Sequence, residues 1–106
     1  EMKKVFVSHP YRGDEKRNFR KVSNICVKIV QKYPDVVPVS PLHAFRFLDE
    51  SKHRDTALTF CEGLLDGCNE LWVFGDWRKS EGCLKEINWA FKLGIPVYFF
   101  NSIDEL

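Results

Sequence analysis

Four short runs of almost uninterrupted apolar residues alternate along this chain with three segments of helical periodicity. The predicted strands cover residues 4–8, 35–39, 70–75 and 95–100, and the predicted helices cover residues 15–32, 56–66 and 82–93. Strands that are apolar at nearly every position are buried on both faces, as in parallel sheets that are covered by helices above and below. The β-α-β-α-β-α-β order therefore constrains the chain to an α/β fold.

The residues at the helix ends support this assignment. Asp14 and Asp55 are predicted N-caps. Tyr33-Pro34 ends the first helix, and Gly67 and Gly94 follow the other two. We predict a small doubly wound parallel sheet of Rossmann or flavodoxin-like type, with helices on both faces.

The composition argues against several classes of partner. The length suits a single domain, residues 1–106, and a hydrophobic content of 44% supports a packed core. The net charge of +1 leaves no broad basic face of the kind that duplex nucleic acid requires. No apolar run is long enough to cross a membrane. We therefore expect neither a nucleic acid duplex nor a membrane as a partner.

The four cysteines are Cys26, Cys61, Cys68 and Cys83, and none of them forms a C-x-x-C pair. No histidine is spaced to complete a zinc site, so we expect no metal. Reduced thiols in a cytoplasmic protein are the simplest interpretation. Cys83 could be a reactive thiol at a helix start, but no histidine lies near it in sequence, which favours a small packed residue.

The unusual residues of the chain gather in the loops after the first three predicted strands. These loops are residues 8–14, residues 40–54 and residues 75–82. The 40–54 segment is long for a connection in a small domain, and such loops are often functional. In doubly wound sheets, ligands bind beyond the carboxyl ends of the strands, so these loops are expected to form the site.

The third of these loops leads into the element Ser80-x-Gly82-x-x-x-Glu86. A hydroxyl and a glycine at a helix start allow an anion to approach backbone N–H groups. The apolar face of this helix is expected to consist of Leu84, Ile87, Ala90, Phe91 and Leu93. Glu86 is in register with Cys83 and Ala90, so it lies on or beside this buried stripe. A carboxylate there is costly to desolvate, and catalytic carboxylates are often placed in this way.

Two loops hold candidate ligand-binding residues, each with a plainer alternative. Arg12 can bind a phosphate or carboxylate bidentately, and Gly13 would let a ligand approach the backbone. Alternatively, Arg12 is a solvated surface residue and Gly13 only makes the turn. Trp77 can stack on a nucleobase or pack down on the 40–54 segment.

Glu62 is a second candidate carboxylate. It lies four residues after Leu58 and three before Leu65, at the edge of their apolar stripe. If its helix meets that of Glu86 at the carboxyl end of the sheet, the two acids would form a pair suited to an oxocarbenium-like transition state. The alternative, which the residues alone favour, is a flank position that reaches to water.

Three segments that together span nearly the whole chain match a known pattern. They are residues 5–13 (VFVSHPYRG), residues 61–75 (CEGLLDGCNELWVFG) and Ser80-x-Gly82-x-x-x-Glu86. In them the chain resembles the nucleoside 2-deoxyribosyltransferase superfamily, including its small deoxynucleoside-monophosphate N-glycosidase branch. The resemblance is closest to short bacterial and phage-borne domains of that superfamily, mostly of unassigned function.

The resemblance implies a role for each matching residue. Glu86 matches a nucleophilic glutamate that attacks the anomeric carbon. Glu62 matches a position, usually aspartate, that assists the departing base. The elements that bind the 5′-phosphate match four residues: Arg12, Gly13, Ser80 and Gly82. His9 and Tyr11 belong to the same matching loop and are expected to contact the substrate.

Two positions depart from the family pattern. Phe6 stands where the family commonly has a tyrosine whose hydroxyl orients the sugar and the nucleophile, and Tyr11 is a candidate replacement for that hydroxyl. Glu62 is one methylene longer than the usual aspartate. In relatives a neighbouring subunit often completes the site, so the resemblance also implies a homo-oligomer.

Three functional hypotheses result. The leading one is hydrolysis or transfer at the N-glycosidic bond of a (deoxy)nucleoside 5′-monophosphate through a glutamate nucleophile, without a cofactor. The second, motivated by Phe6, is a non-catalytic nucleotide-binding or sensing domain of the same fold. The third is a protein-interaction domain with an exposed aromatic surface around Phe45, Phe47 and Trp77.

Overall fold

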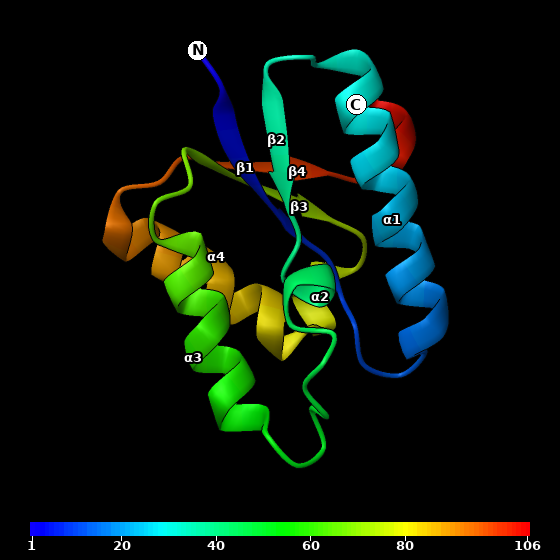
Figure 1. Cartoon of the computed structure of the whole chain (residues 1–106), viewed down its shortest axis with the longest axis vertical. Helices are drawn as coiled ribbons and strands as arrows, with labels where there is room; N and C mark the ends of the chain where they lie inside the picture. Colours follow the sequence, from blue (N-terminus) through cyan, green and yellow to red (C-terminus); the bar gives the residue numbers. More distant parts are fainter.

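The computed structural model describes residues 1–106 as a four-stranded parallel sheet with helices on both faces (Figure 1). The strands are β1 (Lys3–Ser8), β2 (Val36–Val39), β3 (Glu70–Phe74) and β4 (Val97–Phe100). Their order in the sheet is β2-β1-β3-β4, so the chain leaves β1 towards one edge and β3 towards the other. This confirms the predicted α/β fold with a doubly wound, flavodoxin-like sheet.

The helices are α1 (Glu15–Lys32), α2 (Pro41–Ala44), α3 (Arg54–Leu65) and α4 (Glu81–Leu93), with short 3-10 helices η1 (Trp77–Lys79) and η2 (Ile103–Glu105). Asp14 caps α1 and Gly94 ends α4 with a φ of 72°, as predicted. The prediction that Asp55 caps α3 is wrong, because α3 begins at Arg54 and Asp55 lies inside its first turn. None of the helices is long and apolar enough to cross a membrane.

The alternation of side chains along the central strands divides the core in two. Val5 and Val7 of β1 pack in the cluster that contains α1, whereas Phe6 packs in the cluster that contains Leu65 and Ala90. Figure 1 shows the corresponding layers, with α1 on one side of the sheet and α3 with α4 on the other. Ser8 has the same parity as Phe6, so it faces α4 at the carboxyl end of β1.

The buried stripe of α4 differs in part from the predicted one. Cys83, Glu86 and Ala90 are buried at helical spacing, as expected for Glu86. The prediction that Leu84, Phe91 and Leu93 belong to this stripe is wrong, because all three are exposed. Leu84 and Phe91 each follow a buried residue directly and are therefore turned about 100° away from it around the helix.

Candidate active site

A cavity of about 540 Å³ lies at the carboxyl ends of β1 and β3, where the strand order reverses. Its walls come from the loop after β1, from α2 and the segment that leads to α3, and from the start of α4. This is the edge at which doubly wound sheets bind their ligands, and the loops are those that the sequence predicts.

Glu86 presents a buried carboxyl to this cavity. The residue is 7% exposed, and the hydroxyl of Ser8 donates a hydrogen bond of 2.6 Å to its Oε1. Burial raises the pKa of Glu86 to about 7, against a smaller opposing effect of the Ser8 hydrogen bond. Oε2 of Glu86 makes no hydrogen bond. Every fully buried side-chain oxygen in the structure has a hydrogen-bond partner, so Oε2 is not fully buried and keeps access to the cavity. One oxygen is thus held and the other is available.

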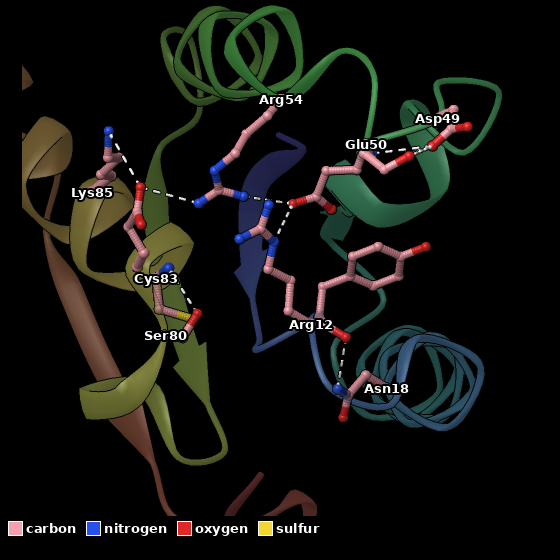
Figure 2. Close-up of polar contacts among 11 residues, drawn as sticks. Arg12, Asn18, Asp49, Glu50, Arg54, Ser80, Cys83 and Lys85 are labelled. Atoms are coloured by element: carbon pink, nitrogen blue, oxygen red, sulfur yellow. Dashed lines mark hydrogen bonds and ion pairs between the residues drawn. The ribbon is translucent and has the colours of Figure 1, made fainter.

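Four charged side chains that line the cavity form a continuous chain of ion pairs. Oε1 of Glu50 lies 3.1 Å from Nε of Arg12 and 2.8 Å from Nη1 of Arg54. Nη2 of Arg54 lies 3.0 Å from Oε1 of Glu81. Figure 2 shows Arg12 and Arg54 reaching Glu50 from different elements, the loop after β1 and the start of α3. The positive charges are therefore compensated within the protein.

Ser80 begins α4 as its N-cap. Its Oγ accepts a hydrogen bond of 3.2 Å from the backbone N–H of Cys83, as Figure 2 also shows. Gly82 is surrounded by open space, since a Cβ there would lie 4.0 Å from its nearest neighbour, Oγ of Ser80. Cys83 is 1% exposed, and burial together with the charge of Glu86 raises the pKa of its thiol to about 11. These properties favour a packed residue over a reactive thiol.

His9 enters the cavity from the loop after β1. Its Nδ1 donates a hydrogen bond of 2.7 Å to the carbonyl oxygen of Pro10, which leaves Nε2 with a free lone pair. Burial lowers the pKa of His9, which favours the neutral form of the ring. No group of three or more His, Cys, Asp or Glu side chains is arranged to hold a metal ion.

The structure brings most of the predicted site residues together. Six of them line the cavity: His9, Tyr11, Arg12, Ser80, Gly82 and Glu86. Gly13 does not line it; with a φ of 98° and open space around it, this glycine serves the turn after β1.

Glu62 and Trp77 also lie outside the cavity, contrary to their predicted contact with substrate. Cys61 takes the inward position on α3, and Glu62, one residue further around the helix, is exposed. The predicted pairing of Glu62 with Glu86 across the cavity is therefore not formed. The indole of Trp77 packs on Phe99, with 4.9 Å between ring centres, rather than on the 40–54 segment.

The sequence does not single out four residues of the site: Ser8, Glu50, Arg54 and Glu81. Ser8 could have been found from strand parity, because it shares a face with Phe6. Glu50 lies in an irregular segment and Arg54 at the first residue of a helix, where no periodicity fixes the direction of a side chain. Their opposite charges at i, i+4 spacing were the signal available for them.

The predicted aromatic surface is not formed as one patch. Phe45 is half-buried against Phe60, with 5.5 Å between ring centres, and Trp77 packs on Phe99. Phe47 alone of the three predicted aromatics is exposed, at 76%. The protein-interaction hypothesis therefore loses the feature that motivated it.

A search of curated proteins finds no match to this chain. One family of domains does match, over residues 3–100, which include all four strands and the candidate site. Since that match covers nearly the whole chain, the protein belongs to the family described as Domain of unknown function (DUF7768).

Proposed function

We propose that this protein cleaves, by hydrolysis or transfer, the N-glycosidic bond of a (deoxy)nucleoside 5′-monophosphate, with Glu86 as the nucleophile. The observation that carries the proposal is a buried carboxyl with a raised pKa and one accessible oxygen, at the ligand-binding edge of the sheet. Groups perturbed in this way are concentrated at functional sites. The resemblance to the nucleoside 2-deoxyribosyltransferase superfamily supports the same residue on separate grounds.

Each bond change of the proposed reaction can be assigned. The ionised Oε2 of Glu86 bonds to C1′ of the sugar as the C1′–N bond breaks, and the base leaves with the electron pair and takes a proton from water. Positive charge builds on the sugar in the transition state, which favours the ionised form of Glu86. Water then attacks C1′, gives its proton to solvent and releases the carboxylate. A second base in place of water gives transfer.

The remaining cavity residues are proposed to hold the nucleotide. Arg12 offers a cation and Ser80 and Gly82 offer the start of α4, so the 5′-phosphate is placed beside them. Tyr11 lines the same cavity and is proposed to contact the sugar. Glu62 has no part in this arrangement, since it is exposed outside the cavity.

The test is Glu86→Gln, which keeps an oxygen for the Ser8 hydrogen bond and removes the nucleophile. Wild type and variant are incubated with a panel of nucleoside and deoxynucleoside 5′-monophosphates, and free base is measured by chromatography. We expect wild type and the matched control Glu62→Gln to release base and Glu86→Gln to release none. Unchanged turnover in Glu86→Gln would falsify the assignment.

The fully buried Phe6 favours a second candidate function, a nucleotide-binding or sensing domain without catalysis. The hydroxyl of the family tyrosine is missing there, and Ser8 supplies the one hydroxyl bonded to Glu86. A thermal-shift screen separates the candidates: stabilisation by nucleotides, with no free base after long incubation, supports the sensing domain. Absence of stabilisation by every nucleotide contradicts both.

We also propose that the protein acts as a cytoplasmic homo-oligomer on small molecules. Phe91 of α4 and Phe99 of β4 are 72% and 49% exposed, and such apolar surface is typical of association sites. Light scattering after size-exclusion chromatography tests the association, and a monomer at every protein concentration would contradict it.

A further inference from the structure

The position between Arg12 and Arg54 is occupied by a carboxylate of the protein itself. Oε1 of Glu50 accepts hydrogen bonds from Nε of Arg12 at 3.1 Å and from Nη1 of Arg54 at 2.8 Å. Both arginines converge on this single oxygen (Figure 2), and all three side chains line the cavity that contains Glu86. Two cations from separate elements, aimed at one acceptor, form the geometry of an anion site.

We propose that Arg12 and Arg54 form a two-arginine phosphate site and that Glu50 is its built-in competitor. The inference rests on the proposed function only in taking a nucleotide as the ligand. A phosphate monoester carries close to two negative charges and three acceptor oxygens, whereas Glu50 shares one oxygen between both arginines. The phosphate therefore satisfies both guanidinium groups more fully than Glu50 does. A neutral nucleoside cannot replace Glu50.

The exposure of these ion pairs allows the exchange. The side chains of Arg12, Glu50 and Arg54 are 58%, 29% and 25% exposed. Because these side chains keep partial access to solvent, their ion pairs are screened, so Glu50 can be released at modest cost. The ligand binds only those molecules in which Glu50 has left the arginines, so its apparent affinity is reduced in proportion to the fraction of such molecules. Glu50 therefore sets both the threshold for binding and the preference for phosphorylated ligands.

Arg54 has a second partner that keeps it in place when Glu50 leaves. Its Nη2 lies 3.0 Å from Oε1 of Glu81 in the first turn of α4. This contact holds the guanidinium group between α3 and α4, beside the cavity. Arg12 has no second carboxylate partner, so its charge depends on the ligand once Glu50 is displaced.

Glu50→Gln tests the proposal, because it removes the competing charge and keeps the size of the side chain. The probes are inorganic phosphate, nucleoside 5′-monophosphates and the matching nucleosides, with affinity measured by isothermal titration calorimetry. We expect Glu50→Gln to bind phosphate and monophosphates roughly tenfold more tightly than wild type, as for one charge-assisted hydrogen bond, with no change for nucleosides. Arg54→Gln is expected to weaken the same ligands by a similar factor.

The matched control is Glu62→Gln, which makes the same change of charge outside the cavity. Circular dichroism establishes that each variant is folded, and Glu50→Ala repeats the test with a different side chain. Unchanged or weaker monophosphate binding in both Glu50 variants would overturn the proposal, since Glu50 would then position the arginines instead of competing. Equal tightening in Glu62→Gln would also overturn it, as a general charge effect.

This outcome is separable from that of the catalytic proposal. Tighter monophosphate binding by Glu50→Gln, without release of base by wild type, supports the phosphate site and contradicts the glycosidic reaction. Release of base that requires Glu86, with no effect of the Glu50 variants on affinity, supports the reaction and contradicts the competitor.

Discussion

Replacing Glu86 by glutamine is expected to stabilise the protein by an amount that grows with pH. Burial raises the pKa of Glu86 from an ordinary value of 4.5 to about 7 in the folded state. Below pH 4.5 the carboxyl is protonated in both the folded and the unfolded chain. Between pH 4.5 and pH 7 it ionises in the unfolded chain first, so the free energy of unfolding of wild type falls as pH rises.

The structure gives the size of this effect. At about 1.4 kcal/mol per pH unit, the interval from 4.5 to about 7 amounts to about 3 kcal/mol of stability, lost in full above pH 7. Glutamine has no charge to desolvate and keeps an oxygen for the hydrogen bond from Ser8. The difference between variant and wild type isolates Glu86, because every other titrating group is common to both proteins.

Urea unfolding followed by tryptophan fluorescence, repeated from pH 4.5 to pH 8.5, measures this difference. We expect the two proteins to have similar stabilities near pH 4.5 and Glu86→Gln to be more stable by about 3 kcal/mol at pH 8. Ser8→Ala in the wild-type background removes a contact that lowers the pKa of Glu86, so the fall in stability should extend to higher pH. A difference between Glu86→Gln and wild type that does not vary with pH refutes the reasoning.

Three further outcomes follow from the structure. Gly75→Ala should destabilise the protein by more than about 1 kcal/mol in thermal unfolding, because φ of Gly75 is 77° and the new Cβ would lie 3.1 Å from the ring of His9. The control Gly63→Ala should not destabilise the protein, because Gly63 lies within α3 with open space around it. Ser80→Ala should cost about 1 kcal/mol through loss of the α4 cap, and unchanged stability would contradict that role. Cys83, with a thiol pKa of about 11, should resist iodoacetamide at pH 7.5 in native protein by mass spectrometry; rapid labelling would contradict its burial.

The periodicity of apolar residues in the sequence predicts most of the fold. The apolar runs and helical spacings predict every strand and each of the three long helices, because burial on two faces or on one stripe leaves a pattern in the sequence itself. The predicted start of α3 is two residues too late, with Asp55 in place of His53 as the N-cap, since propensity fixes helix ends less firmly than packing does. The four-residue helix α2 was missed because it is too short to show a period.

The sequence predicts the position of a site residue only where that residue belongs to the periodic pattern of buried positions. Glu86 sits in register with buried residues of α4, so its position follows from the sequence. Glu62 is exposed, as the residues alone favour for a position at the edge of a stripe, and Cys61 takes the inward position. The predicted contact of Glu62 with substrate came from the resemblance. The contact of Arg12 with Glu50 joins two loops, whose relative placement depends on the whole fold.

The hydrogen bond between Ser8 and Glu86 depends on the position of Ser8 along β1 as well as on its residue type. It joins positions 78 residues apart, and Ser8 reaches α4 because it lies two residues beyond Phe6 on the same face. Inserting one residue between Phe6 and Ser8 would turn the serine to the opposite face of the sheet. Such an insertion would leave the amino-acid composition of the core nearly intact and still separate Glu86 from its partner. The number of residues between Phe6 and Ser8 is therefore part of the site. An insertion can change it while every residue of the site remains present.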